Sequence, residues 1–319
     1  MIDDLELIPD PNDPNAEWYA PKEEDPRAFT RVAVLGAGTM GHGIAQVCAM
    51  AGWGVRLYDI DVVSVEMGMQ QIRKNLDKGV KLGKVAPAIR ETTLATMSTT
   101  TDLDEALDDA GLVIEAVPER LETKKELFFR VEEKVAEDTI LATNTSSLSV
   151  ERIASVLDHP ERFLGLHFFN PVFIMELVEV VVGEKTSQET LDAAAKFVRR
   201  LDKEPVVVRD TPGFASSRLG LTLALEAMRM LEQGVAGVEA IDRAMVLGYR
   251  HPMGPLELTD LIGLDVRLGI AEHLHGELES EVYRPPEILK RMVAEGKTGK
   301  KSGVGFYDWR EVGPGGGEP

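Results

Sequence analysis

Short apolar runs and amphipathic segments alternate over the first two thirds of the chain. The apolar runs, which have the length and composition of buried strands, cover residues 32–35, 55–58, 112–117, 139–142, 163–168, 177–182 and 205–208. Segments with apolar residues at helical spacing lie between several of them and cover residues 44–51, 62–82, 121–135 and 188–201. This alternation of strands and helices predicts an α/β fold with a doubly wound parallel sheet.

The pattern changes near Pro212. Residues 215–293 have a mostly helical pattern that is rich in Leu, Met, Ala and Glu. Glycine and proline interrupt this pattern at Gly234, Gly248, Pro252, Gly263 and Pro285. We therefore expect an α/β domain over residues 31–212 and an all-α domain over residues 213–310.

The two ends of the chain show neither pattern. Residues 1–30 hold nine acidic residues, two basic residues and five prolines. We expect this segment to be an extended arm that becomes ordered only where it packs on a neighbour. Residues 311–319 are rich in glycine and are expected to form a disordered tail.

The composition narrows the functional classes. The formal net charge of −19 at pH 7 argues against nucleic acids and anionic membranes as partners. No run of about 18 apolar residues is present, and the first residues lack the pattern of a secretory signal. The single cysteine, Cys48, excludes an intrachain disulfide and fits a core position. These features predict a soluble cytoplasmic protein without a metal site.

A glycine-rich turn connects the first predicted strand to the first predicted helix. Gly36, Gly38 and Gly41 have the spacing G-x-G-x-x-G. The first permits a tight turn, the second lets the backbone approach a pyrophosphate, and the third lets the helix pack close to the strand. The helix N-terminus then presents N–H groups to the phosphates. Thr39 and Met40 lie inside this turn, so they are candidate cofactor contacts as well.

Asp59 completes the fingerprint of a dinucleotide site. It ends the second strand, 18 residues after Gly41, where an acid can bind both hydroxyls of a ribose. Because its charge would repel a 2′-phosphate, the sequence predicts NAD rather than NADP as the cofactor. The alternative is a glycine turn that has a structural role only.

His167 and Glu179 lie on two consecutive apolar strands. A glutamate inside the run of residues 177–182 is costly to bury unless it is paired or protonated. If the two strands are neighbours, His167 is its obvious partner, and a histidine held by a buried carboxylate is suited to proton transfer. A core pair that only satisfies itself is the alternative.

Polar residues also follow the strand over residues 139–142. Asn144, Ser146 and Ser147 come at the carboxyl end of this strand, where parallel sheets bind ligands. A serine hydroxyl there could bond a substrate oxygen, or these residues could only cap the loop. Beside a nicotinamide site, they suggest a secondary alcohol that gives its proton to His167 and its hydride to the ring.

The chain resembles the short-chain L-3-hydroxyacyl-CoA dehydrogenases, which include the 3-hydroxybutyryl-CoA enzymes. The resemblance extends over roughly residues 31–309. It rests on the motifs LGAGTMGHGIA, EAVPERLETKKELF, NTSSLSV, RFLGLHFFNPVFIMELVEVV, DTPGF, LGYRHPMGPLELTDLIGLD and GKKSGVGFYDW. It implies a Rossmann-like NAD-binding domain, a helical domain that binds substrate and forms a homodimer, and acyl-CoA thioesters as substrates.

The resemblance also implies roles for single residues. His167 would be the general base and Glu179 its orienting partner. Ser146 would bond the 3-hydroxyl or keto oxygen, and Asn170 would help to place the thioester. The adenosine half of NAD would be held by Gly36, Gly38, Gly41 and Asp59. The positions that line the nicotinamide half match Glu119, Lys124 and Asn144.

Three lysines, Lys74, Lys78 and Lys81, fall on one face of the helix expected over residues 62–82. A solvated helix face explains such a stripe without any ligand. Beside a CoA thioester, the same lysines would bind the 3′-phosphate or the pyrophosphate.

The chain departs from the family pattern at three points. Ser217 stands where the family commonly has an asparagine that contacts substrate, within a pattern such as GFxxNR. Serine is shorter, so a water or an altered substrate pose is expected there. Glu176 stands where family members often have lysine, so a positive charge near the site is missing. The sequence does not indicate how this change affects CoA binding. The acidic arm of residues 1–30 has no counterpart in the family core.

Other functions are compatible with the sequence. A dehydrogenase of the same fold could act on a free hydroxy acid, as the gulonate-type relatives do. Dehydrogenases of the hydroxyisobutyrate type are disfavoured, because they use a catalytic lysine and lack a histidine–glutamate pair. A non-catalytic NAD-binding or structural oligomer is the last alternative. The joint presence of Ser146, His167, Asn170 and Glu179 argues against it.

Overall fold

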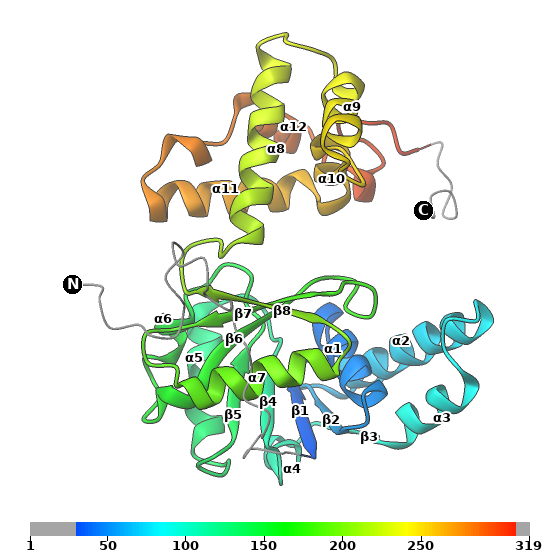
Figure 1. Ribbon diagram of the computed structural model, residues 1–319, viewed down its shortest axis with the longest axis vertical. Coiled ribbons are helices and arrows are strands. Elements are labelled where there is room, and N and C mark those ends of the chain that lie inside the picture. Colours follow the sequence, from blue (N-terminus) through cyan, green and yellow to red (C-terminus); the bar gives the residue numbers. More distant parts are fainter. Residues whose placement is uncertain (1–29, 311–319) are drawn as a thin grey trace, which may run out of the picture. The chain divides into compact units, whose positions relative to one another are not determined.

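Eight strands form one sheet in the first of two units, which meet in the sequence between Thr211 and Pro212 (Figure 1). The computed structural model describes residues 30–310, so residues 1–29 of the expected arm and the expected tail 311–319 lie outside the described residues. The strands are β1 (Arg31–Leu35), β2 (Gly54–Tyr58), β3 (Met97–Thr100), β4 (Leu112–Glu115), β5 (Ile140–Thr143), β6 (Phe163–Phe168), β7 (Leu177–Val182) and β8 (Glu204–Arg209).

The doubly wound sheet expected from the sequence is confirmed, with one difference. The strand order is β3-β2-β1-β4-β5-β6-β7-β8, and the pairs from β3 to β6 are all parallel. However, β7 pairs with β6 in antiparallel fashion, and β8 then runs parallel to β7. Only residues 169–176 connect β6 to β7, which is too short for the crossover that parallel neighbours need.

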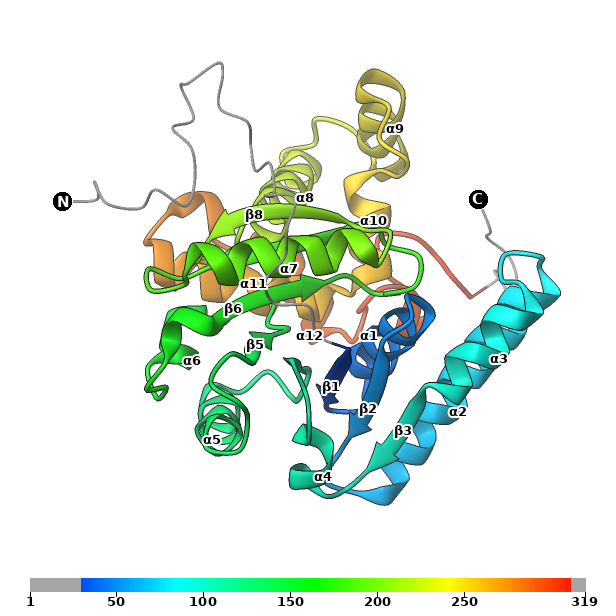
Figure 2. The same ribbon diagram turned by 60° about the horizontal axis from the view of Figure 1, so that its bottom comes forward.

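Helices cover both faces of this sheet. They are α1 (Thr39–Met50), α2 (Val62–Lys81), α3 (Pro87–Ala95), α4 (Leu103–Leu107), α5 (Leu121–Glu132), α6 (Val150–Ala154) and α7 (Gln188–Arg200), with a 3₁₀ turn η1 (Pro160–Arg162). Figure 2 shows α1 to α3 on one side of the sheet and α5 and α6 on the other. Trp53, after α1, packs on Phe197 of α7, whereas Phe128 of α5 meets Phe163 of β6; both pairs of ring centroids lie 4.8 Å apart.

Residues 83–111 received no element in the sequence analysis, yet the structure places α3, β3 and α4 there. The strand β3 lies at the edge of the sheet and has the sequence Met-Ser-Thr-Thr, with its residues exposed or half-buried. An edge strand of this kind lacks the continuous apolar run by which buried parallel strands are found in a sequence.

The second unit is helical, as expected. Its helices are α8 (Ser216–Glu232), α9 (Val238–Tyr249), α10 (Pro255–Ile262), α11 (Leu264–Leu278) and α12 (Glu287–Ala294), with 3₁₀ turns η2 (Glu281–Tyr283) and η3 (Lys300–Ser302). The helix α8 buries one side, including Leu221 and Met228, in the core of this unit, while Leu219 stays 72% exposed. None of the helices in residues 30–310 has the length and apolar composition needed to cross a membrane.

Two buried carboxylates, Asp260 and Asp242, hold the last described segment of the second unit against its helices. Asp260 accepts hydrogen bonds from the backbone N–H groups of Phe306 and Tyr307 and from the indole of Trp309. Asp242 accepts a 2.8 Å hydrogen bond from the Tyr307 hydroxyl. Burial raises the pKa of Asp260, although these donors oppose the change. The motifs TDLIGLD and GFYDW therefore fasten the last described segment to the helices.

Candidate active site

The turn between β1 and α1 depends on three glycines. Gly36 has a φ of +105°, a conformation that favours glycine. A Cβ on Gly41 would lie 1.7 Å from the carbonyl oxygen of Gly36, so only glycine lets α1 begin this close to the strand. A Cβ on Gly38 would meet no atom within 4 Å. The missing side chain of Gly38 therefore leaves open space at the helix N-terminus, where a pyrophosphate can approach.

A cavity of about 450 Å³ extends from this turn. Its lining comes from the glycine turn, the end of β2 and residues 116–118 after β4. The predicted cofactor residues that line it are Gly36, Gly38, Thr39, Met40 and Asp59. Gly41 does not line the cavity but packs directly against the backbone of Gly36. The space over Gly38 and the carboxylate beside it fit a dinucleotide.

Two carboxylates face this cavity. Asp59 accepts hydrogen bonds of 2.8 Å from the backbone N–H groups of Ala37 and Ile60, which fixes its orientation. Asp61, which the sequence analysis missed, caps α2 and accepts a 2.9 Å hydrogen bond from the N–H of Ser64. Hydrogen bonds from the Ser64 hydroxyl and backbone hold the pKa of Asp61 below its usual range. Two negative charges at this end of the cavity disfavour an additional phosphate.

We expect Gly38→Ala and Gly41→Ala to fail in different ways. The methyl group at Gly38 enters open space, so the protein should keep its stability but bind NADH roughly tenfold or more weakly. The methyl group at Gly41 collides with backbone, so this variant should lose about 1–3 kcal/mol of unfolding free energy. Fluorescence titration with NADH and chemical denaturation measure the two effects. Parent-like NADH affinity in Gly38→Ala would contradict the assignment of the turn.

The strands β6 and β7 place His167 and Glu179 directly opposite each other. The two residues are register partners in the antiparallel pair, and Nδ1 of His167 lies 2.8 Å from Oε2 of Glu179. Their exposed fractions are 6% and 1%. A carboxylate at Nδ1 fixes the ring and makes Nε2 the nitrogen that can take a proton. The contact between His167 and Glu179 that the sequence predicts is therefore present. Their catalytic role stays a prediction.

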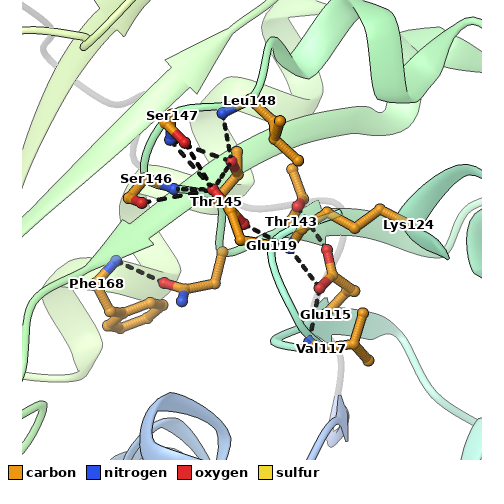
Figure 3. A network of polar contacts seen from close by, with 11 residues as sticks. Glu115, Val117, Glu119, Lys124, Thr143, Thr145, Ser146, Ser147, Leu148 and Phe168 are labelled. Carbon is orange, nitrogen blue, oxygen red and sulfur yellow. Dashed lines mark hydrogen bonds and ion pairs between the residues drawn. The ribbon is translucent and has the colours of Figure 1, made fainter. Parts of the chain in front are cut away.

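The turn after β5 is organised by one carboxylate, as Figure 3 shows. Oε1 of Glu119 accepts hydrogen bonds from the Thr145 hydroxyl at 2.5 Å and from the backbone N–H of Ser146 at 2.9 Å. It also accepts one from the N–H of Ser147 at 3.2 Å. Although burial opposes it, the charge of Lys124 and these donors hold the pKa of Glu119 below its usual range. Glu119 therefore stays ionised and fixes the position of Ser146.

Asn144 connects this turn to the strand that carries His167. Its Oδ1 accepts a 2.9 Å hydrogen bond from the backbone N–H of Phe168, the residue after His167. Because β5 and β6 are parallel neighbours, their carboxyl ends lie at the same edge of the sheet. Ser146, which follows β5, and His167, near the carboxyl end of β6, therefore lie at the same edge of the sheet.

Lys124 and Glu115 lie beneath Glu119. The Lys124 side chain is fully buried, and its Nζ lies 2.7 Å from Oε1 of Glu115 and 3.2 Å from Oε2 of Glu119. Burial raises the pKa of Glu115, an effect that the charge of Lys124 opposes. The sequence analysis missed Glu115, although the signal was present: one acid inside the apolar run of residues 112–117, as for Glu179.

The other predicted substrate residues are exposed or half-buried. Asn170 is exposed in the segment that follows β6, and the lysine stripe of α2 is exposed along its length. Ser217 is half-buried in the first turn of α8. The roles of these residues stay predictions.

Lys203 is a further residue that the sequence analysis missed. Its Nζ donates hydrogen bonds of 2.6 Å to the carbonyl oxygens of Val172 and Met175, and its side chain is mostly buried. Burial lowers the pKa of its ammonium, while the nearby charge of Glu176 opposes the change. Lys203 thus anchors the segment that begins with Asn170.

Comparisons with known proteins cover both units. Residues 31–211 match the family described as 3-hydroxyacyl-CoA dehydrogenase, NAD binding domain, and residues 213–309 match its C-terminal domain. A probable 3-hydroxybutyryl-CoA dehydrogenase of Bacillus subtilis is 43% identical over 88% of this chain and 98% of its own. The human mitochondrial hydroxyacyl-coenzyme A dehydrogenase is 42% identical over 88% of this chain and 91% of its own.

Solved structures agree with the sequence relatives. The crystal structure of (S)-3-hydroxybutyryl-CoA dehydrogenase from Ralstonia eutropha has a TM-score of 0.85 and is 39% identical in sequence. That comparison covers 88% of this chain and 99% of the other.

Proposed function

The chain belongs to the 3-hydroxyacyl-CoA dehydrogenase family and is an NAD-dependent oxidoreductase, and we propose that His167 and Glu179 move the proton in its reaction. The reaction is the reversible oxidation of an L-3-hydroxyacyl-CoA to the 3-ketoacyl-CoA, with 3-hydroxybutyryl-CoA as the proposed short-chain substrate. The observation that supports the proposal best is the 2.8 Å contact between Nδ1 of His167 and the buried carboxylate of Glu179.

NAD, when bound, supplies the hydride acceptor. In the proposed oxidation, Nε2 of His167 takes the proton of the 3-hydroxyl as the C3–H bond breaks. Glu179 holds the imidazole ring and stabilises the imidazolium that forms. The Ser146 hydroxyl donates a hydrogen bond to the 3-oxygen, and the Asn170 amide helps to position the thioester. In the reverse direction the same imidazolium returns its proton to the 3-oxygen.

We propose the cofactor and CoA contacts from the same geometry. The N–H groups and open space around Gly38 hold the pyrophosphate, with Thr39 and Met40 beside it. Asp59 accepts hydrogen bonds from the ribose hydroxyls. The nicotinamide half is assigned to the residues around the turn after β5, which are Glu119, Lys124 and Asn144. The phosphates of CoA are assigned to the α2 stripe, which is Lys74, Lys78 and Lys81.

Oxidation of NADH in the presence of 3-keto substrates tests this function. Acetoacetyl-CoA, a longer 3-ketoacyl-CoA ester and free acetoacetate are compared at equal concentration. We expect turnover of the CoA esters and little turnover of the free acid, because the phosphates of CoA supply binding energy that the acid lacks. Comparable turnover of free acetoacetate would favour the dehydrogenase of a free hydroxy acid.

Ser217 provides a test of the substrate contact outside the first unit. If it touches substrate, Ser217→Asn should change kcat/KM with acetoacetyl-CoA by roughly fivefold to a hundredfold, in either direction, because one altered polar contact is worth about 1–3 kcal/mol. Ser217→Ala is the matched control that removes the hydroxyl. If both variants stay within about twofold of the parent at unchanged stability, the contact is refuted.

We also propose a homodimer formed through residues after Pro212. The second unit exposes large apolar side chains, among them Leu219 at 72%, Leu247 at 68% and Tyr249 at 75%, more than a solvated surface favours. Sedimentation equilibrium at micromolar concentration should give twice the mass of the chain, and a monomer would contradict the proposal.

A cytoplasmic location is proposed as well, since the one cysteine, Cys48, is buried and unpaired.

A further inference from the structure

Glu115 is a buried carboxylate that has no direct part in the proposed reaction. It is 0% exposed at the end of β4. Its Oε1 lies 2.7 Å from both the backbone N–H of Val117 and Nζ of Lys124, and its Oε2 accepts a 2.6 Å hydrogen bond from the Thr143 hydroxyl. A buried carboxylate is tolerated only with such a set of partners.

The partners of Glu115 lie on both sides of the proposed reaction site. Val117 lines the cofactor cavity, and Thr143 is the last residue of β5, directly before the turn that carries Ser146. Glu115 therefore joins the wall of the cofactor cavity to the strand that leads into this turn. Figure 3 shows these groups converging on the one carboxylate.

Lys124 extends this connection to Ser146 itself. Its ammonium is shared by Glu115 and Glu119, and its side chain is 0% exposed. Glu119 in turn accepts the backbone N–H of Ser146 and the hydroxyl of Thr145. Because a single ammonium balances two carboxylates, loss of one carboxylate shifts the ammonium toward the other. Such a shift changes the contact between the ammonium and Glu119, the carboxylate that holds the turn.

We propose that Glu115 is a positioning residue of the dehydrogenase reaction, which acts through Lys124 and Glu119 to place Ser146 against the substrate oxygen. The inference rests on the proposed contact between Ser146 and substrate. A displacement of about 1 Å at such a contact can lower a rate by up to about a hundredfold, so a residue without any substrate contact can matter for turnover.

A double-mutant cycle separates positioning from a merely structural role. The variants are Glu115→Gln, which keeps the shape and removes the charge, and Ser146→Ala, which removes the proposed contact. We expect Glu115→Gln to lower kcat with acetoacetyl-CoA by on the order of tenfold in the parent, but by less than about twofold in the Ser146→Ala background. The dissociation constant for NADH should change by a smaller factor than kcat, because Glu115 hydrogen-bonds to only one of the proposed cofactor residues, Lys124, and to none of those proposed for the ribose and the pyrophosphate.

Thr143 supplies a second, milder test in case Glu115→Gln does not fold. Thr143→Val removes the hydroxyl that donates to Glu115 and keeps the side-chain shape, whereas Thr143→Ser keeps the hydroxyl. In the same cycle, Thr143→Val should lower kcat more than Thr143→Ser, and the difference should vanish in the Ser146→Ala background.

Each other outcome overturns the inference in a recognisable way. An equal loss of kcat in both backgrounds means that Glu115 supports the fold and does not act through Ser146. Weaker NADH binding at unchanged kcat means that the network serves only the cofactor wall. A parent-like kcat in Ser146→Ala itself would refute the proposed role of Ser146 and this inference together. An equal loss of kcat in both backgrounds would refute only this inference and would leave the proposed role of Ser146 intact.

Discussion

His167→Ala should lower kcat by roughly 10²- to 10⁴-fold, the range typical for loss of a general base, while NADH still binds. The reason is that Nε2 of this ring is the proposed proton acceptor, whereas the cofactor cavity is lined by other residues. Steady-state kinetics with acetoacetyl-CoA and fluorescence titration with NADH measure the two properties separately.

Glu179→Gln is the matched variant of the partner. It keeps the shape of the side chain beside Nδ1 but removes the charge that stabilises the imidazolium. It should therefore also be slow, with NADH affinity unchanged. If either variant turns over at a near-normal rate, the pair is a core contact that only satisfies itself, and the proposed mechanism loses its base.

The enzyme should use NADH at least about a hundredfold more efficiently than NADPH, because the juxtaposition of like charges costs several kcal/mol. Asp59 and Asp61 both line the cavity beside the glycine turn, so a 2′-phosphate would meet two negative charges. Comparison of kcat/KM for the two reduced cofactors measures the preference.

Asp59→Asn is the control for this preference. It removes one of the two charges with little change of shape. The ratio of kcat/KM for NADH to that for NADPH should therefore decrease but stay above one, because Asp61 remains. Equal or better efficiency of the parent with NADPH would show that the carboxylate at the end of β2 does not select the cofactor.

The elements that position the cofactor could be predicted from the sequence because their signals are local. The strand β1, the glycine turn and α1 follow one another within 20 residues, residues 31–50, and each has its own pattern of apolar residues and glycines. The pairing of His167 with Glu179 could be predicted as well, since a lone acid in an apolar run requires a partner. Here the connection between the strands is short, and the register brings the two side chains together.

The remaining parts of the site depend on partners that are distant in the sequence. Glu115 meets Thr143 because β4 and β5 are parallel neighbours, a relation that no local pattern encodes. Lys203, directly before β8, donates hydrogen bonds to the carbonyl oxygens of Val172 and Met175, and a sequence pattern does not show which backbone carbonyl groups accept such bonds. The edge strand β3 was missed for a related reason, since its polar residues resemble a loop.

Formation of NADH from NAD and L-3-hydroxybutyryl-CoA is the decisive measurement for the proposed reaction and for the role of His167. The D-ester and free 3-hydroxybutyrate serve as controls in the same assay, and His167→Ala is run beside the parent protein. We expect the parent to form NADH from the L-ester with little turnover of either control, and His167→Ala to be slower by roughly a hundredfold or more. Equal rates with the free acid would refute the proposed substrate, and a His167→Ala variant as fast as the parent would refute the proposed base.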